Sequence, residues 1–447
     1  MAIHAKTALT PAGWVRDLRL EIAGGQITGL SAGVAPEPGD HRTEILLPGM
    51  SNLHSHAFQR GFSGLTELRG PGRDSFWTWR EVMYRFALSL TPDQMQAVAA
   101  LACVEMLEAG YTRLGEFHYL HHAPDGGRYA DPAEMSTRIF AAATETGIAL
   151  THLPVFYAHG GFGPQPAGEG QRRFLHDYDS FARLVEACEA MARPQDRVGV
   201  APHSLRAASI AQINRLAQDF LGRPFHIHIA EQVKEVEDCL AFSGARPVDY
   251  LLQNAPVGPS WCLIHATHLS PDELRGIANS GAVVGLCPLT EANLGDGIFP
   301  GADFIAAGGR YGIGTDSNVE ITLSGELKQL EYSQRLAQRA RNVMTEAGST
   351  GASLYTAALA GGAQALSAPD PVIAIGAPAD LVALHDPLGL DLAGGDQILD
   401  RWIFGRDLRV ADVWASGQHL VKEGRHHLRD PIGAAYSQVL REVVAAG

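Results

Sequence analysis

Residues 47–61 read LPGMSNLHSHAFQRG, a short apolar run with a Pro-Gly turn that leads directly into His54 and His56. Side chains at positions i and i+2 of a strand point to the same side, so these two imidazoles share one face. Imidazole is the commonest metal ligand at neutral pH. Two hydrogen-bonded loop histidines would give the same pattern, so a metal site requires further ligands elsewhere in the chain.

Similar short apolar runs recur along the chain, and most are followed by helix-forming sequence. In the clearest predicted helix, residues 91–110, Thr91 and Gln94 form a capping box and Gly110 ends the helix. The runs are residues 44–54, 112–120, 147–157, 197–207, 223–232, 260–270, 282–293 and 311–318. Eight strands alternating with helices are typical of an α/β fold, the (β/α)₈ TIM barrel.

Polar residues lie at or just past the ends of these runs. They are His54, His56, Glu116, His203, His228, Glu231, His265 and Asp316. Active sites of (β/α)₈ barrels form at the carboxyl ends of the strands, so we expect these side chains to meet there.

Both ends of the chain are rich in short strands punctuated by glycine and proline. Neither end alone has enough strands to bury a face, so we expect them to pair. The prediction is a small β-sandwich domain made of residues 1–46 and 368–447, attached to a catalytic barrel of residues 47–367.

The formal net charge of −14 makes nucleic acids and anionic membranes poor partners. No apolar run is long enough for a transmembrane helix, and the N-terminus lacks the features of a signal peptide. The five cysteines are scattered and lack CxxC spacing, which favours a reducing compartment. We therefore expect a cytoplasmic protein that binds neither nucleic acids nor membranes.

Three histidines and one aspartate could surround a single divalent cation. His228 ends its strand, whereas His226 lies two residues deeper and is expected to be a packed core residue. Asp316 follows the last strand and supplies a carboxylate. Together with His54 and His56 these residues would hold Zn²⁺ and leave a position open for water, as in catalytic zinc sites.

Proton transfer at such a centre needs further titratable groups. Glu231 lies three residues after His228, and His265 ends the next strand. With Asp316 they form a predicted catalytic set for moving protons and stabilising charge. A solvated carboxylate at a helix start is the alternative interpretation of Glu231.

With these residues in place, the chain resembles the amidohydrolase superfamily over nearly its whole length. The family pattern is HxH after strand one, His after strands five and six, and Asp after strand eight, with a GxxADLV motif matched by residues 376–382. Binuclear members use a carboxylated lysine after strand four, but no lysine occurs between Lys6 and Lys234. Glu116 could bridge two metals instead. The His-x-x-Glu pattern of His228 and Glu231 is that of the mononuclear deaminases, which implies one metal.

Five segments are similar to the formiminoglutamate deiminases of this superfamily: HSHAFQRGFSG, FWTWREVMYR, GEFHYLHH, PHSLRA and HIHIAEQ. These enzymes hydrolyse N-formimino-L-glutamate to N-formyl-L-glutamate and ammonia in histidine degradation. The resemblance implies that Arg206 pairs with a substrate carboxylate, a role that suits the guanidinium fork. It also implies substrate contacts from Gln59, Tyr119 and His203, and a homodimer. His₃Asp sites accept zinc or iron, so Fe²⁺ stays an alternative to Zn²⁺.

Some alternatives remain open. Arg80 would bind the second substrate carboxylate or form a surface ion pair. Phe76, Trp77 and Trp79 would pack a lid onto the barrel mouth, or would stack a heterocyclic base such as guanine or cytosine in a related deaminase or chlorohydrolase. A non-catalytic scaffold would have lost metal ligands, and none of the expected set is missing.

Overall fold

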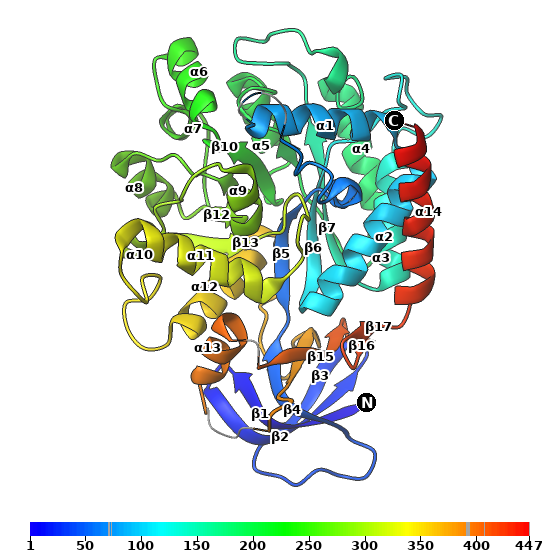
Figure 1. The fold of residues 1–447 in the computed structure, drawn as a ribbon, viewed down its shortest axis with the longest axis vertical. Coiled ribbons are helices and arrows are strands. Elements are labelled where there is room, and N and C mark those ends of the chain that lie inside the picture. Colours follow the sequence, from blue (N-terminus) through cyan, green and yellow to red (C-terminus); the bar gives the residue numbers. More distant parts are fainter. Residues whose placement is uncertain (70–71, 73, 390–393, 406, 447) are drawn as a thin grey trace.

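The computed structural model describes residues 1–69, 72, 74–389, 394–405 and 407–446. Two parts are visible in Figure 1: a ring of parallel strands surrounded by helices, and below it a sheet made from both ends of the chain. Among the described residues, no helix combines the length and apolar character needed to cross a bilayer.

The parallel strands run in the order predicted from the sequence. They are β5 (Met50–Ser55), β6 (Tyr111–His118), β7 (Ala149–Phe156), β8 (Arg197–Val198), β9 (Ala201–Pro202), β10 (Phe225–Ile229), β11 (Trp261–His265), β12 (Val283–Leu286) and β13 (Arg310–Ile313). Their hydrogen bonds form two continuous ladders, β5 to β8 with β9 on β7, and β10 to β13.

Isolated parallel bridges connect the two ladders. Ser55 pairs with Asp316 at one junction, and Val200 with Phe225 and Ser204 with His228 at the other. The hydrogen bonding around the ring is therefore interrupted rather than uniform. Both junctions bring predicted site residues on different strands side by side.

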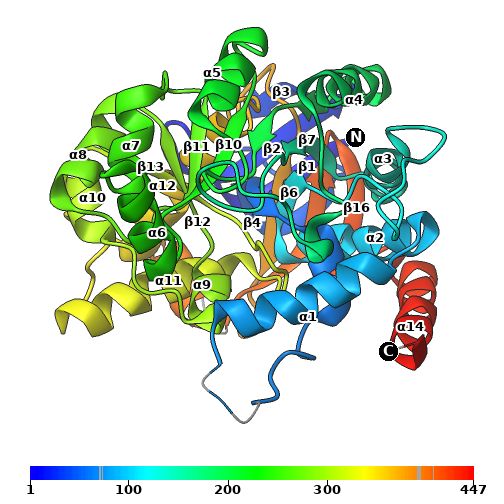
Figure 2. The same cartoon turned by 90° about the horizontal axis from the view of Figure 1, so that it is seen from above.

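Helices surround the strands, as Figure 2 shows from above. They are α1 (Phe76–Ser89), α2 (Pro92–Ala109), α3 (Glu134–Thr146), α4 (Tyr178–Met191), α5 (Ile210–Asp219), α6 (Val233–Ser243), α7 (Pro247–Asn254), α8 (Pro271–Ser280), α9 (Pro288–Leu294), α10 (Gly301–Ala306), α11 (Leu323–Gln338) and α12 (Thr350–Ala365), with 3-10 turns η1 (Ala57–Phe62) and η2 (Glu169–Gln171). The predicted caps of α2 are confirmed: Thr91 and Gln94 form the capping box, and Gly110 has a φ of 99°.

The two ends of the chain share one eight-stranded sheet, called the terminal sheet below. Its order is β17-β16-β15-β14-β4-β1-β2-β3. The strands are β1 (Ala2–Thr10), β2 (Gly13–Ala23), β3 (Gln26–Ser31), β4 (His41–Pro48), β14 (Leu381–His385), β15 (Arg409–Ala415), β16 (Gln418–Lys422) and β17 (Arg425–His426). A separate apolar core that includes Ile3, Leu20, Leu381 and Trp414 lies on this sheet. The predicted pairing of the two ends is confirmed.

Two helices follow the terminal strands β14 and β17. Helix α13 (Gln397–Phe404) packs on α11 and α12, and α14 (Arg429–Ala446) runs along α2 (Figure 1). Arg429 forms ion pairs with Glu105 and Glu108 of α2 at 3.3 and 3.2 Å. The last helix of the chain is thus anchored to the helical layer of the barrel.

Candidate active site

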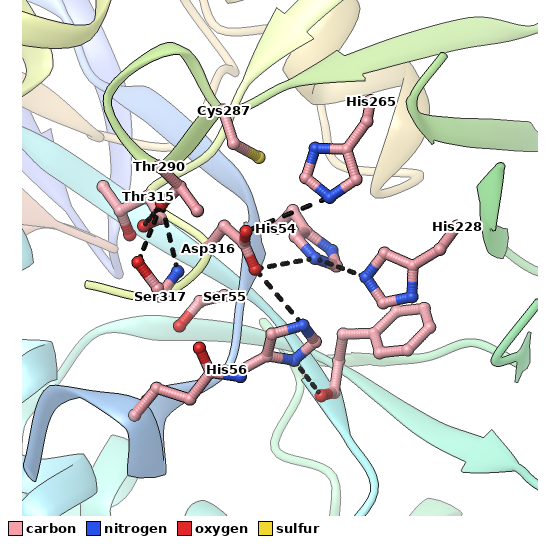
Figure 3. Close-up of polar contacts among 12 residues, drawn as sticks. His54, Ser55, His56, His228, His265, Cys287, Thr290, Thr315, Asp316 and Ser317 are labelled. Carbon is pink, nitrogen blue, oxygen red and sulfur yellow. Dashed lines mark hydrogen bonds and ion pairs between the residues drawn. The ribbon is translucent and has the colours of Figure 1, made fainter. Parts of the chain in front are cut away.

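Four side chains converge where strands β5, β10 and β13 end. They are His54, His56, His228 and Asp316, and all four are buried. Asp316 Oδ1 lies 3.4 Å from His54 Nε2 and 3.2 Å from His56 Nε2. His228 Nε2 lies 3.1 Å from His54 Nε2. Figure 3 shows the three rings turned toward one another and toward the carboxylate.

In two of these rings, His56 and His228, the outer nitrogen fixes which atom faces the centre. Nδ1 of His56 lies 2.9 Å from the carbonyl oxygen of Phe117, and Nδ1 of His228 lies 3.1 Å from that of His203. A proton on each Nδ1 donates to these carbonyls and leaves the Nε2 lone pair free, as in metal-ligating histidines. The four ligand atoms all lie within 4.8 Å of one another.

The ionisation states also suit a divalent cation, because metal ligands must be deprotonated. Burial lowers the pKa of His54 to about 3 and also lowers the pKa values of His56 and His228. Burial opposes ionisation of Asp316, but its hydrogen bond with His54 and the neighbouring imidazoles hold its pKa well below the ordinary value. Three neutral imidazoles and one carboxylate therefore fit Zn²⁺ or Fe²⁺.

The local backbone holds Asp316 in this position. Its φ is 42°, a left-handed conformation that aspartate tolerates better than most residues. Its N–H donates to the carbonyl oxygen of His54 at 3.0 Å, and its own carbonyl accepts from the N–H of His56 at 2.9 Å. The last strand is thereby locked to the first at the point where both supply ligands.

Glu231 and His265 lie beside this cluster. His265 Nε2 is 3.9 Å from both Glu231 Oε1 and Asp316 Oδ2. Burial raises the pKa of Glu231 to about 7. Burial lowers the pKa of His265, but the carboxylates of Glu231, Glu291 and Asp316 outweigh it and raise this pKa to about 10. The site thus pairs a cationic imidazole with a carboxyl group that titrates near neutrality.

Two further buried carboxylates were not assigned a role from the sequence. Glu291, on α9, lies 3.2 Å from His265 Nδ1 through Oε1 and accepts the N–H of Cys287. Glu235, on α6, accepts the N–H of Glu231 at 3.1 Å. Glu291 follows the seventh apolar run, so its place after a strand was the available signal. Glu235 is one turn beyond Glu231 and carries no such signal.

The five predicted substrate contacts line one cavity together with His56, His228 and Asp316 of the cluster. The five contacts are Gln59, Arg80, Tyr119, His203 and Arg206. Gln59 Nε2 donates to the Tyr119 hydroxyl at 2.8 Å. Arg80 lies over the ring of Trp77, with its guanidinium carbon 4.5 Å from the ring centroid. The free space of about 60 Å³ holds only a few water molecules.

Neither Arg80 nor Arg206 forms a hydrogen bond or ion pair with another residue in the described part of the chain. Arg206 Nε is fully shielded from solvent and has no partner there. An unpaired buried guanidinium nitrogen is costly, so this cavity offers an unsatisfied hydrogen-bond donor. Burial opposes the charge of Arg206, but the nearby Glu235 and Glu231 outweigh it and raise its pKa. The surface ion pair considered for Arg80 is wrong within the described residues.

Glu116 and His226 lie apart from the ligand cluster. Glu116 belongs to β6, the second strand of the ring, and its Oε1 accepts the N–H of Ala57 at 2.8 Å. Burial raises the pKa of Glu116 to about 8, and Glu116 belongs to none of the metal-ligand groups found among the described residues. His226 is fully buried with Nε2 2.8 Å from the carbonyl oxygen of Ala365, and its prediction as a core residue is confirmed.

Two family models match the chain. Residues 45–420 match the amidohydrolase family, and residues 1–44 match the N-terminal domain of formimidoylglutamate deiminase HutF. Formimidoylglutamate deiminase of Pseudomonas aeruginosa is 50% identical over 99% of both chains.

Solved structures give the same result. A crystal structure of an amidohydrolase from Brucella melitensis superposes with a TM-score of 0.97, at 53% identity over 99% of both chains. An adenosine deaminase from Xanthomonas campestris, solved with bound zinc, has a TM-score of 0.82 at 20% identity and covers 99% of this chain and 98% of its own. The latter likeness concerns the fold alone.

Proposed function

The chain belongs to the amidohydrolase family, and from this premise we propose that it hydrolyses N-formimino-L-glutamate to N-formyl-L-glutamate and ammonia. The observation that carries the proposal is the pair of arginines, Arg206 and Arg80, which line the same cavity as the metal-ligand cluster. Neither has a carboxylate partner among the described residues. A substrate with two carboxylates and a hydrolysable C–N bond matches both halves of this cavity.

One divalent metal in each active site, Zn²⁺ or Fe²⁺, would be held by His54, His56, His228 and Asp316. When bound there, it would lower the pKa of a water molecule toward neutrality and polarise the formimino group. The buried, neutral imidazoles and the ionised carboxylate support this assignment. Glu116, the residue that could have bridged a second metal, is engaged with the backbone of η1.

The residues beside the cluster would move the protons. Ionised Glu231 accepts one proton of the water. As the water oxygen bonds to the formimino carbon, Asp316 accepts the second proton and the cationic His265 stabilises the developing charge. Glu231 carries its proton to the imino nitrogen, and the proton on Asp316 passes to the same nitrogen. The C–N bond then breaks, ammonia leaves and the carbon becomes the formyl group of the product. The raised pKa values of Glu231 and His265 suit these two roles.

Substrate contacts would come from the other residues that line the cavity. Arg206 would bind one carboxylate of the glutamate, and Arg80 the second. Gln59, Tyr119 and His203 would donate or accept hydrogen bonds along the rest of the substrate. Because the free space is only about 60 Å³, the cavity must widen to admit a glutamate derivative, and a shift of α1 would provide the room. The aromatic residues Phe76 and Trp79 of α1 would then act as part of a lid.

Deamination of a heterocyclic base is the second candidate function. Phe76, Trp79 and Tyr84 line the cavity, and such rings could stack on a base. A neutral base would offer neither arginine a hydrogen-bonded carboxylate partner, which favours the dicarboxylate.

A coupled assay separates the two functions. Purified protein of known metal content is given N-formimino-L-glutamate, guanine or cytosine, and both ammonia and the deaminated product are measured. We expect equal amounts of ammonia and N-formylglutamate from the first substrate. Ammonia from a base, with none from formiminoglutamate, would reverse the assignment.

The assembly and location are also proposals. We expect a cytoplasmic homodimer, and light scattering coupled to gel filtration measures the mass directly. A monomer mass of 47.8 kDa in solution would overturn the dimer.

A further inference from the structure

A second group of metal-ligating side chains lies in the terminal sheet, apart from the active-site cluster. His41 begins β4, Asp412 lies in β15 and His419 lies in β16. His41 Nε2 is 3.3 Å from Asp412 Oδ2, and His419 Nε2 is 2.7 Å from Asp412 Oδ1. One ligand atom from each residue lies within 4.8 Å of the other two.

These spacings are close to those of a metal centre. Zn–N bonds of about 2.0–2.1 Å in a tetrahedral site put neighbouring ligand atoms roughly 3.3 Å apart. The two imidazoles approach different oxygens of the same carboxylate, so small rotations would bring three ligands around one ion. Two histidines and one carboxylate are a ligand set for first-row divalent cations.

A buried tryptophan holds both imidazoles in this arrangement. The ring of Trp414, which is fully buried, stacks on His419 with centroids 4.4 Å apart and an interplanar angle of 19°. The same tryptophan meets His41 edge-on at 5.2 Å. The ligand rings are therefore pre-positioned, which reduces the entropy lost when an ion binds.

Apart from its 3.3 Å approach to Asp412, His41 Nε2 is shielded from solvent and makes no well-aligned hydrogen bond to any residue in the described ranges. Its side chain is nevertheless 33% exposed, because the cluster opens on a surface groove that also contains Lys6, Glu44 and His385. Water from this groove can complete the coordination of an ion.

We propose that His41, Asp412 and His419 form a second metal site, which takes Zn²⁺ or a similar first-row divalent cation. The ion would connect the strand that precedes the barrel to two strands that follow it. Its role would be structural: it would fasten the N-terminal and C-terminal parts of the terminal sheet, while the active-site cluster performs the chemistry.

The stoichiometry of zinc binding tests the proposal on the full-length, untagged protein. Protein stripped with a chelator is dialysed against buffered Zn²⁺, and bound zinc is measured by atomic emission. We expect two zinc ions per chain for the wild type and one for Asp412→Asn. One zinc per chain in the wild type would overturn the proposal without reference to any variant.

Two further variants separate metal binding from misfolding. His41→Gln changes a partly exposed side chain and is expected to lose the same single ion, with turnover of formiminoglutamate unchanged. His385→Gln is the matched control, because His385 lies in the same groove but pairs with Glu44 at 3.0 Å. The His385→Gln variant should still bind two zinc ions per chain. If His41→Gln and Asp412→Asn each still bound two zinc ions per chain, His41 and Asp412 would not be ligands of the second ion.

Thermal unfolding supplies a readout apart from activity. Zn²⁺ should raise the Tm of the wild type further than that of Asp412→Asn, because only the wild type gains the ion in the terminal sheet. Equal increases in Tm would contradict a structural role.

Discussion

Glu291 lies 3.2 Å from His265 Nδ1 and is buried with it. A negative charge at this position favours the protonated ring, and the other nitrogen of that ring faces Glu231 and Asp316. The carboxylate on α9 thus acts on the reaction through the imidazole, and we regard Glu291 as a positioning residue.

Replacing Glu291 with glutamine removes this charge and keeps the size of the side chain. We expect kcat to fall on the order of 10-fold or more, since a hydrogen bond to a charged group contributes about 1.5–3 kcal/mol. The pKa of His265, raised to about 10, would fall. The basic limb of the pH–rate profile should therefore move to lower pH, with KM little changed. An unshifted profile would assign Glu291 to packing alone.

Replacing Glu231 with glutamine should abolish turnover, because glutamine cannot carry a proton to the leaving nitrogen. General acid–base catalysis is worth about 100-fold or more. Metal content should equal that of the wild type, since Glu231 is not among the predicted ligands. Wild-type-like turnover in this variant would refute the role.

The pH dependence of the wild type tests the same residue. Burial raises the pKa of Glu231 to about 7, and the ionised form must accept the proton that is later delivered. As the pH falls below 7, Glu231 is protonated in the free enzyme, so kcat/KM should decrease. A flat profile of kcat/KM between pH 5 and 8 would contradict this assignment.

Replacing Arg206 with methionine keeps an apolar stem and removes the guanidinium. We expect kcat/KM for formiminoglutamate to fall roughly 10- to 150-fold, mainly because KM rises. This factor corresponds to about 1.5–3 kcal/mol, the contribution of a charge-assisted hydrogen bond. Arg80→Met should also lower kcat/KM for formiminoglutamate. Arg85→Met is the control, because Arg85 lies on the same helix as Arg80 but is exposed outside the cavity. Unchanged KM values for both cavity variants would remove the argument for a dicarboxylate.

Helix α12 packs against β13 through a glycine. A Cβ at Gly361 would collide with the backbone carbonyl of Tyr311, whereas a Cβ at Gly433 of α14 would meet open space. Gly361→Ala should therefore lower the free energy of unfolding by several kcal/mol, since neither helix nor strand can yield cheaply. Gly433→Ala should raise it by about 0.5–1 kcal/mol, because alanine is the better helix former. Urea denaturation of both variants measures the contrast, and a stabilising Gly361→Ala would contradict the packing.

Buried histidines predict the acid sensitivity of the fold. Burial lowers the pKa of His226 to about 4, below the value of about 6.5 in an unfolded chain. The neutral, buried ring of His226 contributes fully to the free energy of unfolding above pH 6.5. This contribution is lost as the pH falls from 6.5 toward 4, because over this range the unfolded chain binds a proton that the folded chain does not. One such proton gives a slope of about 1.4 kcal/mol per pH unit.

In His226→Gln the free energy of unfolding should depend less steeply on pH, by about 1.4 kcal/mol per pH unit. Glutamine can still donate to the carbonyl oxygen of Ala365 but does not titrate. The measurement is urea denaturation of both proteins at several pH values between 7 and 4.5, with a chelator present. Equal slopes in the two proteins would show that His226 does not contribute.

The sequence predicted the strand ends of the barrel because each apolar run stops where a polar side chain begins. His54, His228, His265 and Asp316 come together for that reason, although their roles in catalysis stay predictions. The single fourth strand expected at residues 197–207 is instead split into β8 and β9. At Gly199 the chain changes partners: its N–H donates to His152, whereas the N–H of Val200 donates to Pro224. Such an exchange depends on tertiary contacts that no local pattern records.

Residues that act from helices were harder to find. Glu291 contacts His265 from α9, the short helix that directly follows β12. Its place after a strand was a signal, but nothing in the spacing indicated His265 as its partner. The C-terminal helix α14 lies on α2 through pairs such as Arg429–Glu105. The division of the chain at residues 46/47 and 367/368 stays a prediction.

Strand β4 ends at Pro48 and β5 begins at Met50, with only Gly49 between them. The N–H of Gly49 donates to Asp380 in the C-terminal part of the chain, and Tyr355 holds the carbonyl of Pro48. His54 and His56 therefore lie at the end of a nearly continuous strand pair, β4 and β5, whose other end is fixed in the terminal sheet, away from the active site. A deletion or slip in that sheet would move the two imidazoles along the barrel axis, so the first 46 residues set the register of the catalytic centre and are not a removable appendage.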